Sequence, residues 1–108
     1  IVLYGAGRLG RVYYRQIMSG RTGKIELVGW VDRDYQKLAG YPGKIDSPEL
    51  LRHIEFDYVL LALADREPAE EVRRHLTEVF GIEPGKIVWL LQHEIFWEYA
   101  EAAGLIRG

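Results

Sequence analysis

Three glycines near the start of the chain have the spacing of a phosphate-binding turn. Gly5, Gly7 and Gly10 follow the apolar run at residues 1–4 and stand at the beginning of a helical pattern. The first glycine permits a tight turn, the second lets the backbone approach a phosphate, and the third lets helix and strand pack closely. Unpaired N–H groups and the positive end of the helix dipole would face this turn. The pattern therefore predicts a site for a pyrophosphate.

The side chains between these glycines belong to the same candidate site. Ala6, Arg8 and Leu9 complete the turn. Arg8 has two interpretations, which the sequence weights evenly. Its guanidinium can give a charge-assisted hydrogen bond to a phosphate, or it is a solvated loop arginine.

An acid ends the second apolar stretch. Asp32 follows the last glycine by about 20 residues, the offset at which a dinucleotide-binding unit places a carboxylate for the ribose hydroxyls. Arg33 comes next and can cover an adenine face or meet a 2′-phosphate. Because Asp32 would repel that phosphate, NAD is favoured over NADP. An adenosylmethionine site is a competing hypothesis, but the glycine spacing and the short chain argue against it.

Other residues that could carry chemistry are not arranged in a known pattern. His53, His75 and His93 pair with no histidine or carboxylate at metal-binding spacing, so surface or capping roles are favoured. No tyrosine has a lysine four residues later, and no G-x-S-x-G turn occurs. The cluster at residues 65–67 can contact a ligand, but a helix-starting cap formed by an acid before Pro68 is the favoured role. No metal site or catalytic acid–base pair is visible.

Strand-like and helix-like segments alternate along the chain. The expected strands are residues 1–4, 24–31, a short 44–45, 56–63 and 87–91, and the expected helices are 8–19, 48–53, 68–80 and 94–103. This alternation predicts an α/β fold, a doubly wound, Rossmann-like parallel sheet with about five strands in the order 3-2-1-4-5. Ligands bind such sheets beyond the carboxyl ends of the strands, which adds Ala62 and Leu63 to the candidate site.

Each expected helix has an apolar face that should pack on the sheet. The first should bury Leu9, Val12, Tyr13 and Ile17, and the third Ala69, Val72, Leu76, Val79 and Phe80. Trp97 falls outside the apolar face of the last helix, so we expect it to be exposed and to contact a partner subunit or the rest of the protein.

Size and composition limit the function further. With 108 residues the chain fits one domain, residues 1–108, and is too short for a nucleotide domain plus a substrate domain. It begins on a strand without a methionine, so we expect a domain of a longer protein. The net charge of −2 gives no reason to expect nucleic acid, and no apolar run has membrane-spanning length. Absence of cysteine excludes disulfides and thiolate chemistry, and it fits a cytoplasmic location.

Most of the chain resembles the Rossmann-like domains attached to bacterial sugar-nucleotide epimerases and dehydratases, and to glycosyltransferases of surface polysaccharide synthesis. The segments that carry this resemblance are residues 4–10, 27–32, 47–51, 57–62 and 81–88. The amino-terminal part also looks like the cofactor domain of glucose-fructose oxidoreductase-type enzymes, through residues 5–10 and 31–34. That family's Glu-Lys-Pro segment after the fifth strand is absent.

These resemblances imply a domain that binds NAD or a nucleotide-sugar diphosphate within a sugar-nucleotide or polysaccharide biosynthesis enzyme. Two alternatives remain open. The chain can be the cofactor half of an NAD-dependent oxidoreductase, or a regulatory module that forms a homodimer through its last helix.

Overall fold

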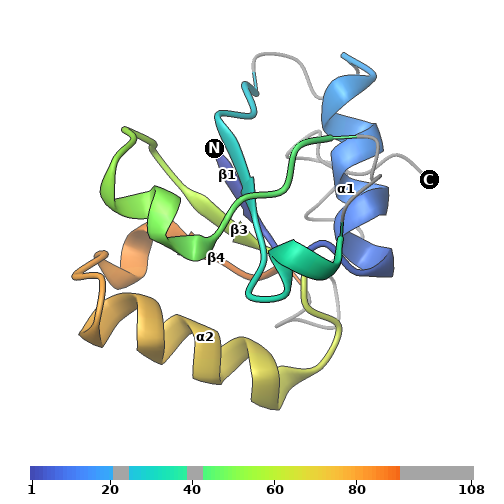
Figure 1. Ribbon diagram of the computed structural model, residues 1–108. Helices are drawn as coiled ribbons and strands as arrows, with labels where there is room; N and C mark the ends of the chain where they lie inside the picture. Colours follow the sequence, from blue (N-terminus) through green and yellow to red (C-terminus); the bar gives the residue numbers. More distant parts are fainter. Residues whose placement is uncertain (21–24, 39–42, 91–108) are drawn as a thin grey trace.

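Four short parallel strands form the sheet at the centre of the molecule (Figure 1). A computed structural model describes residues 1–20, 25–38 and 43–90. The strands are β1 (Val2–Tyr4), β2 (Gly29–Val31), β3 (Val59–Leu61) and β4 (Ile87–Val88), and their order across the sheet is β2-β1-β3-β4. Since β1 and β3 lie inside the sheet and are buried on both faces, their sequences are continuously apolar.

The strand order differs from the predicted five-strand order, because the segment expected as the third strand does not form one. At this place the structure has an isolated parallel bridge between Val31 and Asp46. Asp46 donates its backbone N–H to the Trp30 carbonyl over 2.8 Å and accepts one from Asp32 over 3.1 Å. The contact ends there, because Ser47 caps a short 3-10 helix, η2 (Pro48–Arg52), by accepting the N–H of Glu49.

Two α-helices follow β1 and β3. The bounds of the first, α1 (Arg8–Met18), agree with the prediction to within one residue. After this helix the chain turns at Gly20, which has a positive φ of 76°. The second, α2 (Arg66–Glu78), begins and ends two residues before the predicted bounds. Two further 3-10 turns are η1 (Tyr35–Lys37) and η3 (Pro84–Lys86). Each α-helix therefore starts close to the carboxyl end of an inner strand.

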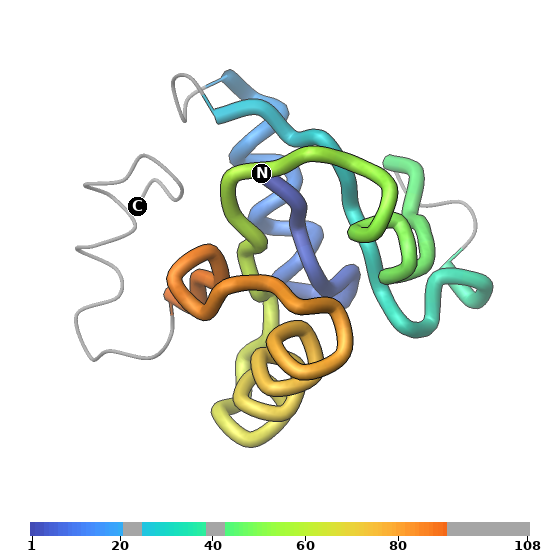
Figure 2. The backbone as a smooth tube through the Cα atoms, turned by 90° about the vertical axis from the view of Figure 1, so that its left-hand side faces the viewer, coloured from blue at the N-terminus to red at the C-terminus, as the bar shows by residue number. Residues whose placement is uncertain are grey.

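The two helices cover opposite faces of the sheet (Figures 1 and 2). On one face, α2 packs on alternate residues of β1 and β3; this cluster includes Ala69, Val72, Leu76, Val2, Tyr4, Val59 and Leu61. On the other face, Tyr13 of α1 packs with Leu3, Trp30 and Leu60. The period-2 alternation of strand side chains thus divides the core into two layers.

Some predicted core residues are not buried. Val12 is 36% exposed and Val79 is 51% exposed, so their inward placement was wrong. Val12 lies at the edge of the α1 stripe, and Val79 follows the last residue of α2. Phe80 is half-buried against the α2 cluster, while Leu9 is half-buried on the α1 side.

The predicted last helix, which includes Trp97, lies outside the described residues, and so does His93. Within the ranges that the structure does describe, no helix has the length and apolar character to cross a membrane.

Candidate functional site

The glycine turn after β1 is shaped by two close backbone approaches. Gly5 has a φ of +113°, and a Cβ there would lie 2.9 Å from the Ala62 carbonyl oxygen. A Cβ on Gly10 would overlap the Gly5 carbonyl oxygen. By contrast, a Cβ on the exposed Gly7 would meet no atom within 4 Å. Two glycines are therefore required by packing, and the third keeps the surface of the turn bare.

The start of α1 is open to an anion. Gly7 occupies the N-cap position and has no side chain to cap the helix, and no acidic residue lies in the first turn. The hydrogen bonds of the helix begin with Arg11 donating to the Gly7 carbonyl over 3.1 Å. The preceding N–H groups and the positive end of the helix dipole face outward at this end.

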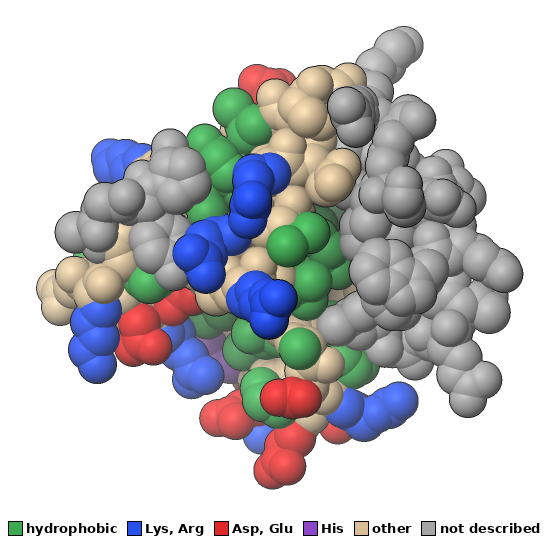
Figure 3. Space-filling view, turned by 90° about the vertical axis from the view of Figure 1, so that its right-hand side faces the viewer, with side chains coloured by type: hydrophobic (Ala, Val, Ile, Leu, Met, Phe, Trp, Pro, Cys, Tyr) green, Lys and Arg blue, Asp and Glu red, His purple; other side chains and the backbone are tan. Residues whose placement is uncertain are grey.

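Basic side chains are spaced along α1, beginning at this opening. The exposed residues of α1 include Arg8, Arg11 and Arg15, and the helix contains no acid. A group of Lys and Arg side chains stands in the middle of the face that carries α1 (Figure 3). Arg8 takes part in none of the ion pairs that the described residues form. Positive charge on α1 can therefore attract a negatively charged ligand, beside the Asp32 carboxylate that is bonded to Ala6.

Asp32, the predicted ribose acid, holds the glycine turn. Its Oδ2 accepts the backbone N–H of Ala6 over 2.7 Å, and its Oδ1 accepts that of Asp34 over 2.7 Å. A carboxylate has about four lone-pair positions, so each oxygen can accept one further hydrogen bond. Asp32 is half-buried and lines a pocket, which leaves it accessible to a ligand. The sequence offset did not indicate its bond to Ala6.

A pocket of about 180 Å³ lies at the carboxyl edge of the sheet. It is lined by Tyr4, Gly5, Asp32, Arg33, Asp34, Leu63, Pro68 and Val72. The structure thus brings Gly5, Asp32, Arg33 and Leu63 together, as the strand ends predicted. Among the other candidate residues, Ala62 is buried beneath Gly5 and donates its N–H to the Tyr4 carbonyl, while Ala6, Gly7, Arg8, Leu9 and Gly10 belong to the adjoining turn and the start of α1.

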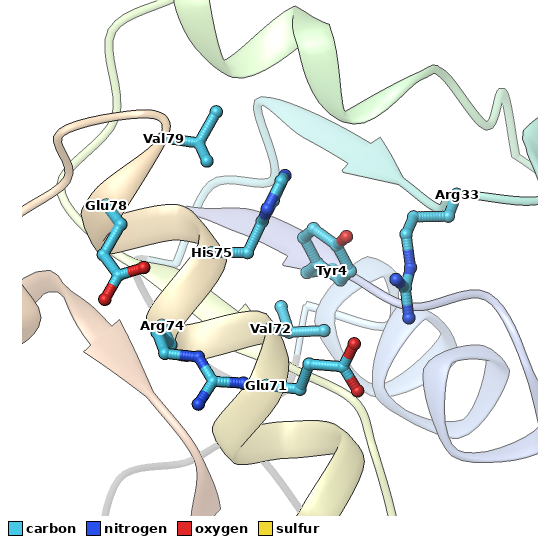
Figure 4. A pocket seen from close by; sticks show the side chains of 8 residues that line it. All are labelled: Tyr4, Arg33, Glu71, Val72, Arg74, His75, Glu78 and Val79. Carbon is cyan, nitrogen blue, oxygen red and sulfur yellow. The ribbon is translucent and has the colours of Figure 1, made fainter.

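A second pocket, also of about 180 Å³, continues the first along α2 (Figure 4). The two pockets share Tyr4, Arg33 and Val72. Arg33 and Glu71 extend toward each other from opposite walls (Figure 4). The sequence did not single out Tyr4 or Val72 as lining residues; the one available signal was that Tyr4 is the last residue of its strand.

Tyr4 supplies a neutral hydroxyl to this crevice. Burial raises the pKa of its phenol, the positive charge of Arg33 opposes that shift, and the negative charge of Asp32 adds to it. The hydroxyl therefore keeps its proton at neutral pH and can donate or accept a hydrogen bond. Both charged residues act on it because all three groups line the same pocket.

The remaining candidates do not form a second centre. His75 lines the pocket along α2 and meets the Phe80 ring edge-on at 5.5 Å, while His53 is an exposed residue at the end of η2. Asp65 takes the N-cap position of α2 without a side-chain capping bond. The described residues include no cluster of His, Asp or Glu that could hold a metal ion. A larger pocket, about 840 Å³, includes Ile1, Val28 and Tyr58 at the opposite, amino edge of the sheet.

The chain belongs to the C2185-like, N-terminal family, whose model matches residues 1–88. The matched segment contains the four strands, both α-helices and every candidate site residue. No curated protein and no solved structure matches the chain.

Proposed function

We propose that this domain binds a nucleoside diphosphate at the carboxyl edge of its sheet, in a Rossmann-like arrangement. The ligand would be NAD or a nucleotide-sugar diphosphate, and the parent protein an enzyme of sugar-nucleotide or surface-polysaccharide biosynthesis. One observation carries the proposal: the uncapped, acid-free start of α1 adjoins a pocket lined by Gly5 and Asp32.

The diphosphate would bind at the glycine turn. Gly7 has no neighbour within 4 Å of its Cβ position, so a phosphate oxygen can approach the backbone there. The outward N–H groups at the start of α1 would donate to it, and Arg8 would add a charge-assisted hydrogen bond. Since none of these donors has to be released from an acidic side chain in the first turn, the site is organised before the ligand arrives.

The ribose and base would bind beyond the turn. Asp32 retains lone pairs for two hydroxyl donors, which fits a ribose next to the diphosphate. Arg33, Leu63 and Val72 line the continuation of the crevice and offer a cation and apolar surface to a base. NADP fits less well than NAD, because its 2′-phosphate would meet the Asp32 carboxylate.

The size of the crevice favours one nucleoside over a whole dinucleotide. Pockets that enclose a drug-sized ligand measure about 300–1,000 Å³. Each of the two adjoining pockets measures about 180 Å³, which suits a ribose and a base, with the diphosphate on the turn outside. ADP and NAD should therefore bind with similar affinity, through the portion they share.

Calorimetric titration of the chain with ADP, NAD, NADP, UDP-glucose and adenosine tests the proposal. We expect ADP and NAD to bind within about threefold of each other, and adenosine about tenfold more weakly, since it lacks the diphosphate. Asp32→Ala should weaken the binding of ADP far more than the binding of pyrophosphate. Asp57→Asn, at the exposed opposite edge of the sheet, should change the affinity for neither ligand. If millimolar amounts of every probe leave both the heats and the melting temperature unchanged, the proposal fails.

The same panel separates the alternatives for the parent protein. Preference for UDP-glucose supports a sugar-nucleotide enzyme. Preference for NAD with no binding of UDP-glucose supports the cofactor half of an NAD-dependent oxidoreductase.

A further inference from the structure

One peptide unit of the glycine turn is hydrogen-bonded to a residue of β2 and to the residue that follows β2. The carbonyl of Gly5 accepts the indole Nε1–H of Trp30 over 2.8 Å. The N–H at the other end of this peptide, that of Ala6, is donated to Asp32 Oδ2 over 2.7 Å. In addition, Gly5 donates its own N–H to the Val31 carbonyl over 2.8 Å. Trp30 and Asp32 therefore hold the two ends of this peptide, and Val31 holds the peptide before it.

The indole of Trp30 is itself fixed. Its side chain is 2% exposed, and its ring stacks on Tyr14 with centroids 4.4 Å apart and planes 14° apart. Gly43 lies so close that an added Cβ would come within 3.0 Å of both rings. The donor is thus held in one direction by an aromatic stack and the loop beside it.

The orientation of the Gly5–Ala6 peptide matters because glycine permits others. Gly5 has a φ of +113° and no Cβ, so its own backbone can adopt other conformations; the close contacts with Gly10 and Ala62 and the hydrogen bonds select this one. A rotated peptide would leave the Gly5 carbonyl without its buried donor and would free Asp32 from Ala6. The carbonyl dipole would also change direction, and the N–H groups of the turn would no longer face an anion.

We propose that Trp30 is a positioning residue, which sets the glycine turn and the Asp32 carboxylate in their ligand-binding orientation by holding the Gly5 carbonyl. This inference rests on the proposed function for the nature of the ligand. It assigns Trp30 a role that neither its core position nor the glycine motif implies.

The chain contains a matched control. Trp89 donates its Nε1–H to the Leu63 carbonyl over 2.7 Å, at the equivalent place after β3. Its side chain is also buried, 5% exposed, so removing its donor should lower stability to a similar degree. Leu63 belongs to the crevice wall and not to the phosphate turn, which makes Trp89 a test of stability without turn orientation.

The experiment replaces Trp30 alone by benzothienylalanine, which keeps the ring shape and lacks the N–H donor. Two quantities are measured: the Kd for ADP, and the hydrogen-exchange rate of the Ala6 amide in the free protein. We expect both to rise about tenfold, since the loss of a buried hydrogen bond is worth roughly that factor. Azatryptophan at the same position keeps the donor and should restore both values.

Benzothienylalanine at position 89 should change the Ala6 exchange rate less than about twofold. An equal rise in the Ala6 exchange rate for both variants overturns the proposal, because it would reflect general destabilisation. An unchanged Kd or an unchanged Ala6 exchange rate at position 30 overturns it as well. If the unmodified chain binds no ADP, the proposed function fails by itself, and the Ala6 exchange rate still decides whether Trp30 orients the turn.

Discussion

The two junctions where an inner strand leads into an α-helix are built alike up to a point. The chain passes from β1 into α1 through the glycine turn, and from β3 into α2 through residues 62–65. In each case a tryptophan from the neighbouring strand or its end donates its indole N–H to a carbonyl of the loop. These bonds join Trp30 to Gly5 and Trp89 to Leu63.

The junctions differ in the charge at the start of their helices. The first turn of α1 has no acid and begins with Arg8. By contrast, Asp65 stands at the N-cap of α2 and Glu67 in its first turn. Acids at a helix N-terminus offset the positive end of its dipole. The second junction therefore carries its acids at the helix itself. The acid of the first junction, Asp32, binds the Ala6 N–H before α1 and leaves the first turn of the helix for an external anion.

The largest expected effect concerns packing at the first junction. Gly10→Ala should lower the free energy of unfolding by at least about 3 kcal/mol, because the new methyl group would overlap the Gly5 carbonyl. Urea denaturation measures this change. Gly85→Ala is the control, since its Cβ would meet nothing within 4 Å, and it should alter stability by less than about 1 kcal/mol. A similar loss in both variants would show that the turn is not tightly packed.

A charge reversal should make the first junction resemble the second. Arg8→Glu puts an acid in the first turn of α1, where it would occupy the positive end of the dipole and repel a phosphate. We expect the Kd for ADP to rise about thirtyfold while thermal stability stays constant or increases slightly. Glu67→Gln in α2 should leave the Kd unchanged, and a comparable change there would remove the distinction between the junctions.

A smaller effect is expected where the turn is bare. Gly7 has a φ of −76°, which alanine adopts without strain, and its Cβ would point into open space. Gly7→Ala should therefore keep stability within about 1 kcal/mol and raise the Kd for ADP about tenfold, because the methyl group blocks the phosphate. If calorimetry shows that this variant binds ADP with unchanged affinity, the anion binds elsewhere.

The smallest expected effect concerns a difference between the two faces of the sheet. Tyr13 on the α1 face is 1% exposed, and its hydroxyl is buried with no hydrogen-bond partner in the described part of the chain. The buried residues of α2 are Ala69, Val72 and Leu76, which have no polar side-chain atom. Tyr13→Phe should therefore leave stability at neutral pH unchanged or raise it by up to about 1 kcal/mol.

The pH dependence of that variant checks the cause. Burial raises the pKa of Tyr13 from 10.0 to about 12. Between these values the folded state keeps a proton that the unfolded state loses, so the free energy of unfolding falls as pH rises. Tyr13→Phe should lack this contribution, and the difference between the two proteins should widen from pH 10 to 12. A difference in the free energy of unfolding that stays constant over this pH range would contradict the burial of the Tyr13 hydroxyl as the cause.

The fold followed from the sequence where local and long-range signals agreed. The bounds of α1 were predicted closely, since glycines precede the helix and Ser19 and Gly20 follow it. The third strand was wrong, because a two-residue signal at residues 44–45, of which only Ile45 is apolar, cannot show that the chain leaves the sheet edge at Pro48. Strand lengths were overestimated for a related reason: apolar residues such as Leu90 are buried beyond the strands as well as within them.

The location of the candidate site was predictable from the sequence, but its hydrogen bonds were not. Strand ends brought Gly5, Asp32 and Leu63 to one edge, as expected for a parallel sheet. The bonds of Asp32 to Ala6 and of Trp30 to Gly5 join residues about 25 positions apart through loop geometry, which spacing does not encode. The roles of these residues toward a ligand stay predictions.

The central claim is that the start of α1, and not that of α2, binds an anion. Amide NMR spectra recorded during titration with pyrophosphate, which carries no ribose or base, test it most directly. We predict saturable shifts of the Gly7, Arg8 and Leu9 amide signals, with those of Arg66 and Glu67 unmoved. Saturation with no shift at the glycine turn, or with shifts centred on the start of α2, would contradict the claim.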